Sequence, residues 1–288
     1  MPIFPLTKPL SDHELLQTTC HLYTISLLRL LPYSLLCVGI IHYFRYGKAY
    51  LPHDWQHLHQ QSAMLLLVIM FPLMGIMITI IDKIATNTPA TTGNVIKETA
   101  TQFLSFMGAL ASIAFIPMIL LGLCIGAYFA LLYFRVNMHV AFAWIWFSKL
   151  LIFASIVPKV YAPWLIFSDG LEANDAQNIS SVLVKNHYFK TFTNSLFALL
   201  VIVYFLEVPE MFGYYFANIH IAPLWVELVA EGLLAIIGPW SLVFLLTNKY
   251  NLQLRKKAEI ADPDYHARKQ KVQSAIPTKK KDSDSISF

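Results

Sequence analysis

Six long apolar stretches are the feature that most constrains how this chain can fold. A helix needs about 20 residues to cross the roughly 30 Å hydrocarbon core of a bilayer, and lipid-exposed backbone must satisfy its hydrogen bonds internally. We therefore expect an all-α, multi-pass transmembrane helical bundle. Its six spans are roughly Leu22–Phe44, Ser62–Ile81, Ala109–Phe134, Val140–Val157, Phe192–Leu206 and Leu224–Thr247.

The overall composition agrees with a membrane environment. Of the 288 residues, 57% are hydrophobic and 13% are charged, whereas about a quarter of a soluble domain is charged. The lipid bilayer is thus the expected partner, and the modest net charge of +4 argues against nucleic acid. We expect an N-terminal cytoplasmic segment at 1–21, one membrane domain at 22–247 and a basic cytoplasmic tail at 248–288 that is partly disordered.

Amphipathic interfacial helices are expected beside the spans. The spacing of Ser11 and Glu14 is that of a capping box, which indicates a short helix before the first span. The 43 residues from Asn94 to Val136 lack a strong stop, so we expect a lead-in helix at Asn94–Phe106 and a hinge near Pro117. Residues Leu171–Phe189 have the pattern of a helix along the membrane surface. The long stretch and the short fifth span leave counts of five and seven spans open.

Basic residues predict the orientation. If both termini are inside, the outer loops hold three Lys or Arg residues, the inner segments hold six, and the tail holds ten more. The positive-inside rule therefore places the N- and C-termini in the cytoplasm. Each basic residue near an anionic leaflet contributes about 1 kcal/mol of attraction, so we expect the tail to contact anionic lipid. A solvated tail is the favoured interpretation, and a tail that binds a protein partner is the alternative.

The most distinctive segment is APWLIFSDGLEANDAQNISSVLVKNHYFKTF, residues 162–192. It resembles an element of bacterial YciC-like inner-membrane proteins and of related multi-pass families, including the membrane domain attached to some glycerophosphodiester phosphodiesterases. Either Ser180 or Ser181 fits the serine position of that element, and Gln177 stands where the family usually has Leu. The resemblance implies the bacterial cytoplasmic (inner) membrane and supplies no catalytic residues. The matching positions are Pro163, Phe167, Asp169, Gly170, Leu171, Ala176, Ser180, Lys185 and Asn186.

Four charged residues are expected at or within membrane depth: Arg29, Lys149, Glu227 and Glu231. A charge at the bilayer centre costs at least about 2.5 kcal/mol, so these side chains should pair or face water. Glu227 and Glu231 are one turn apart and can accept Arg29 or Lys149 from a facing span. A structural ion pair or snorkelling to the headgroups is favoured, and an aqueous path for a cation or proton is the alternative.

Three histidines, His53, His57 and His59, lie close together beside Asp54. Imidazole with carboxylate suits zinc or copper, but an interfacial loop that holds no metal is the favoured interpretation. The chain contains no GxSxG, HExxH, GxxxxGK[ST] or GxGxxG motif, so we expect neither an enzyme nor a cofactor.

Two functions remain in competition. The first is a non-enzymatic role in membrane organisation or assembly, acting through packing with a membrane-protein partner or as a homo-oligomer. The second is a small-solute or ion transporter that uses Glu227 and Glu231.

Overall fold

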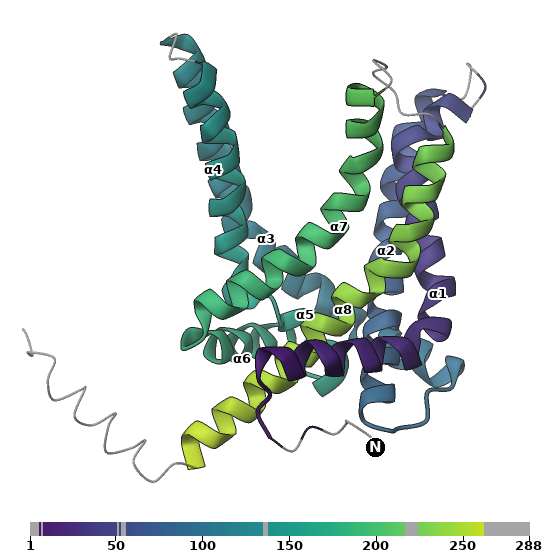
Figure 1. Ribbon diagram of the computed structural model, residues 1–288, viewed down its shortest axis with the longest axis vertical. Coiled ribbons are helices and arrows are strands. Elements are labelled where there is room, and N and C mark those ends of the chain that lie inside the picture. The colour runs from purple at the N-terminus through teal and green to yellow at the C-terminus, as the bar shows by residue number, and fades with distance from the viewer. Residues whose placement is uncertain are drawn as a thin grey trace, which may run out of the picture.

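The computed structural model describes Leu6, Pro52 and residues 8–50, 56–134, 138–216 and 224–261. Within these residues every regular element is a helix, as expected (Figure 1). Eight α-helices and one short 3₁₀ segment follow one another along the described chain. They are α1 Asp12–Tyr50, α2 Gln56–Ala85, α3 Thr92–Tyr133, α4 Met138–Ile156, η2 Val157–Lys159, α5 Ala162–Asp169, α6 Ala173–Lys185, α7 Tyr188–Phe216 and α8 Leu224–Ala261.

Six of these helices, α1, α2, α3, α4, α7 and α8, overlap the six expected spans. In the described part of the chain, five apolar helices are long enough to cross a membrane, and Tyr188–Tyr204 of α7 forms a shorter sixth. The chain is therefore an all-α multi-pass membrane protein. In Figure 1 the beginning of α1, the short helices α5 and α6 and the end of α8 gather at one end of the molecule, which we call the base.

Helix α1 combines the expected lead-in helix with the first span. At its start, the backbone amide of Ser11 donates to the carboxylate of Glu14 over 2.8 Å, and the amide of Glu14 donates to the hydroxyl of Ser11 over 3.3 Å. This confirms the capping box. A helix of 39 residues is about 58 Å long, well beyond the bilayer core, and Figure 1 shows its first turns lying across the base before it rises beside α2.

Helix α3 likewise joins its expected lead-in to the third span, and it continues through Pro117 over 42 residues. Its first part packs into the body of the protein, where Val95, Phe106 and Ala109 are buried. In its most apolar stretch of 18 residues only 11% of the residues are buried, against 33–44% in the corresponding stretches of the other long apolar helices. The remainder of α3 pairs with α4 and stands away from α7 and α8 (Figure 1).

The main core lies at the base, around α5. This helix is apolar and almost wholly buried, and it packs against α2, α3 and α6. Three aromatic rings from α2, α3 and α5 lie next to one another in this core. The ring centroid of Phe106 is 6.3 Å from that of Phe71 and 4.9 Å from that of Phe167. Helix α6 then lies across the base with one face buried (Figure 1), which agrees with the amphipathic pattern in its sequence.

Gly75 makes the close approach of α2 to α5 feasible. A Cβ atom at this position would lie 2.6 Å from the Cζ atom of Phe167 and 2.9 Å from the Cγ2 atom of Thr99. Phe167 is buried against Phe106, so its ring has little room to move. At Gly122 in α3, by contrast, no atom lies within 4 Å of such a Cβ.

We predict that Gly75→Ala lowers the free energy of unfolding by about 1–3 kcal/mol, the usual cost of overpacking a core. Gly122→Ala is the matched control and should be neutral or slightly stabilising, because alanine favours helix by up to about 1 kcal/mol over glycine. Unfolding in detergent, titrated with sodium dodecyl sulfate, measures both. Equal stability of the two variants would show that α2 and α5 do not pack this closely.

Candidate functional site

A group of polar side chains around the buried Lys249 lies where α2, α5 and α8 meet at the base. It contains Asp82 at the end of α2, Ser168 and Asp169 at the end of α5, and Lys249 and Tyr250 in α8. Each polar residue follows directly on an apolar helical stretch. We call this group the polar junction.

Lys249 is the centre of the polar junction. Its side chain is 0% exposed, and its Nζ donates to Asp169 Oδ1 over 2.6 Å and to the hydroxyl of Ser168. The ammonium also lies 4.7 Å from the ring centroid of Tyr250. Asp169 is the last residue of α5, and the carbonyl end of a helix favours a cation. Burial of this charge is therefore offset by a carboxylate, a hydroxyl, an aromatic face and a helix end.

Two further contacts extend the polar junction. The hydroxyl of Tyr250 donates to Asp82 of α2, and the side-chain amide of Gln253 donates to Asp169 Oδ2 over 3.2 Å. Ser168 accepts from Lys249, and its own hydroxyl lies 2.6 Å from the carbonyl oxygen of Trp164. A serine held in this way is fixed as a hydrogen-bonding link between α5 and α8. The arrangement suits a clamp between three helices.

Helix α8 also holds the segment that precedes α1. The backbone amide of Leu10 donates to Asn251 Oδ1 over 2.8 Å, and Arg255 donates to the carbonyl oxygen of Leu10 over 2.6 Å. Asn248 in the same helix donates to the hydroxyl of the fully buried Tyr161 over 2.5 Å. Residues 248–252 are thus packed inside the base, where α8 continues past the last apolar residue of the sixth span.

The residues of the YciC-like element now have structural roles. Gly170 caps α5 with φ = 67° and donates its amide to Ile166 and Leu165, and this left-handed conformation favours glycine. Ser180 is fully buried; its hydroxyl accepts from the amide of Tyr161 over 3.2 Å and donates to the carbonyl oxygen of Pro158 over 2.9 Å. These two backbone groups flank the break between η2 and α5. Ser180 therefore supplies hydrogen-bond partners for a backbone amide and a carbonyl at the point where the helix is interrupted.

The remaining positions of that element shape its helices. Pro163 occupies the first turn of α5, where a missing amide costs little. Ala176 is fully buried in α6, while Lys185 ends α6 and Asn186 caps it. Ser181 bonds only within its own helix, to the carbonyl oxygen of Gln177 at 2.9 Å. Between the two candidate serines, Ser180 is therefore the one that links separate elements.

The four charges expected within the membrane do not form one cluster. The structure pairs Glu231 with His42, whose Nδ1 lies 2.8 Å from one carboxylate oxygen and 2.9 Å from the other. Pairing of Glu231 with Arg29 was wrong because Arg29 lies thirteen residues before His42 in α1, which is about 20 Å along a helix. Glu227 is buried one turn before Glu231.

Lys149, the other possible partner named for the glutamates, lies on a helix away from them. It is exposed on α4, and its ammonium lies 4.7 Å from the ring centroid of Trp146 in the same helix. Helix α4 packs against α3 and η2, so it brings no side chain to α8 at this level. Arg29 is exposed as well and lies beside the end of α2.

The proposed histidine metal site is only partly within the described chain. His53 and the side chain of His57 lie outside the described residues. His59 is described, and its Nε2 lies 2.9 Å from the carbonyl oxygen of Tyr43. Among the residues that the structure describes, no group of three His, Cys, Asp or Glu side chains could hold a metal ion.

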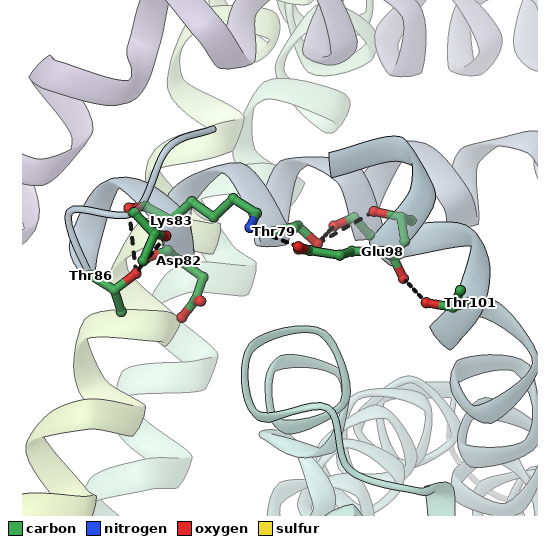
Figure 2. A network of polar contacts seen from close by, with 9 residues as sticks. Thr79, Asp82, Lys83, Thr86, Glu98 and Thr101 are labelled. Carbon is green, nitrogen blue, oxygen red and sulfur yellow. Dashed lines mark hydrogen bonds and ion pairs between the residues drawn. The ribbon is translucent and has the colours of Figure 1, made fainter. Parts of the chain in front are cut away.

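A second polar contact joins α2 to α3 near the same end of the molecule. Figure 2 shows Lys83 of α2 reaching Glu98 of α3, where the Nζ to Oε1 distance is 2.9 Å. In the same view Thr86 turns back onto α2, with its hydroxyl donating to the carbonyl oxygen of Asp82 over 2.9 Å. Asp82 and Lys83 thus direct two opposite charges to different neighbours.

We predict that Lys249→Met lowers the free energy of unfolding by about 1.5–3 kcal/mol, because it removes the charged hydrogen-bond donor of a carboxylate that is only partly exposed. Lys190→Met is the matched control, since Lys190 of α7 pairs with the exposed Asp12 and exposed pairs contribute about 1 kcal/mol or less. Detergent unfolding titrations compare the two variants. A loss for Lys249→Met no greater than that for Lys190→Met would contradict a clamp at the polar junction.

Comparison with models of protein families, with curated proteins and with solved structures found no match for this chain. The resemblance to the YciC-like proteins therefore stays a prediction, carried by residues 162–192. The function has to be inferred from the geometry of the helices and of their polar contacts.

Proposed function

We propose that this chain is a non-enzymatic membrane protein that acts in membrane organisation or assembly, as a YciC-like protein of the bacterial cytoplasmic membrane with both termini inside. Support comes from the contrast between the two parts of the fold. The base is fixed by the pair of the buried Lys249 with Asp169 and by hydrogen bonds, whereas the outer parts of α3 and α4 form a hairpin with many exposed apolar side chains. A fixed platform with an unpartnered apolar hairpin suits association inside the bilayer.

The observation that carries this proposal is the exposure of the α3–α4 hairpin. Large apolar side chains such as Phe115, Leu123 and Phe129 on α3 and Phe147 on α4 are each more than half exposed. Lipid can cover such a surface, but a helix of a second protein chain covers it with more contact where small residues permit close approach. Gly122 and Gly126 supply that place, because no atom lies within 4 Å of a Cβ at either position.

We propose that a transmembrane helix of another protein chain occupies this surface. Phe115 and Gly122 are seven residues apart in α3, so they share one helix face two turns apart. A photo-crosslinking residue at Phe115 should accordingly report on whatever packs at Gly122. A second copy of this chain and a different membrane protein are separate results of the same measurement.

We predict that photo-crosslinking from position 115 in native membranes gives a protein adduct, and that Gly122→Leu reduces its yield at least about tenfold, since a leucine there separates the helices. Gly39→Leu in α1 is the matched control, because a Cβ at Gly39 also meets no atom within 4 Å. Labelling of lipid alone, or an equal loss with Gly39→Leu, would refute the proposal.

Transport is the second candidate, and one contact favours it. His42 of α1 and Glu231 of α8 face each other within apolar helices that pack together, and intramembrane histidine–carboxylate pairs suit proton or cation relays. Glu227 lies one turn away on α8 and is buried too. The same contact serves equally well as a structural link between the two helices.

If transport is the function, Glu231→Gln should abolish ion or solute flux in proteoliposomes while the protein remains folded, because a neutral amide cannot exchange a proton. Lys149→Gln is the matched control, since Lys149 faces outward on α4. Flux that is absent in the native protein, or that is unchanged in Glu231→Gln, would leave the pair with a structural role only.

A further inference from the structure

A cavity of about 430 Å³ lies between α1, the end of α2 and the loop that leads to α3. Its polar lining includes two cations, Arg29 from α1 and Lys83 from α2, together with Asn87 of the loop. Its apolar lining includes Ile25 and Ile84. The cavity is separate from the polar junction and from the hydrophobic face of the α3–α4 hairpin.

Among the described residues that line the cavity and their printed partners, one positive charge is in excess. Lys83 is already paired with Glu98 at 2.9 Å (Figure 2), so these two charges cancel. Arg29 lines the cavity and is exposed. A guanidinium group presents several N–H donors in a plane and binds phosphate through paired hydrogen bonds. The cavity therefore matches a ligand with a single negative charge on a phosphate.

The residues that line the cavity indicate that it lies at the level of the lipid headgroups. Its lining includes Lys83, Asn87 and Thr88, which follow directly on the apolar span of α2, and polar or basic residues that flank a span lie at the membrane–water interface. Asn87 lies just past the end of α2, in the turn with φ = 55°.

We propose that this cavity binds the phosphodiester headgroup of an anionic phospholipid, such as phosphatidylglycerol. Arg29 donates to the phosphate oxygens, Lys83 and the side-chain amide of Asn87 add further donors, and the two isoleucines contact the start of the acyl chains. This site differs from the expected contact between anionic lipid and the basic tail, and it does not depend on the assembly role proposed above.

The proposal is tested by measuring phosphatidylglycerol binding to the full-length protein by native mass spectrometry in detergent. Arg29→Gln should weaken binding about tenfold or more, because hydrogen bonds to charged groups contribute about 1.5–3 kcal/mol. Asn87→Gly keeps the left-handed backbone and removes the amide, so it should weaken binding less. Lys149→Gln is the control for loss of one exposed cation, and it should leave binding unchanged.

A gain of binding provides the sharper test. Glu98→Gln removes the carboxylate that occupies Lys83 and should therefore tighten phosphatidylglycerol binding severalfold in the native background, but much less in Arg29→Gln. Competition with inorganic phosphate distinguishes a site for a lipid headgroup from a site for free phosphate. We expect millimolar phosphate not to displace the lipid. Displacement by phosphate, or an equal effect of Arg29→Gln and Lys149→Gln, would overturn the lipid site.

Discussion

The buried ammonium of Lys249 is the interaction on which the base of the protein depends. Inside a protein an isolated charge costs several kcal/mol, so this lysine restricts which elements can lie next to α8. The carboxylate comes from the end of α5, where Asp169 bonds Lys249 and is followed by the left-handed Gly170 that turns the chain into α6. This contact ties the end of α5 to α8, and the apolar core around Phe167 holds the rest of α5.

This constraint explains why the two parts of the fold differ so strongly in packing. At the base, the break between η2 and α5 is compensated by a side chain from another element, Ser180 of α6. Such contacts are specific in direction and leave little freedom. The outer α3–α4 hairpin has mainly apolar contacts, and lipid can replace those at little cost. The molecule therefore combines a specified base with a hairpin whose surroundings its own chain does not supply.

Features that depend on neighbouring residues in the chain could be predicted from the sequence, whereas contacts between distant residues could not. Span positions and the cap at Ser11 follow from hydropathy and local hydrogen bonding, so they were predictable. Lys249 was grouped with a solvated basic tail because its carboxylate lies eighty residues earlier in the chain. The polar residues directly after each apolar stretch were the available signal, but only the fold shows that three of those stretches end at the same point.

The same limit applies to the four charges near membrane depth, and it changes the case for transport. Arg29 and Lys149 are exposed on different helices, and Glu231 faces His42 instead of either of them. A relay across the bilayer needs groups spaced along a continuous path, whereas a single pair between α1 and α8 moves a charge over one contact distance. His42 lies only two residues before Phe44, where the expected first span ends and Arg45 follows, so the pair lies near one surface. One contact near one surface links two helices effectively, and transport would require further polar groups between this pair and the base.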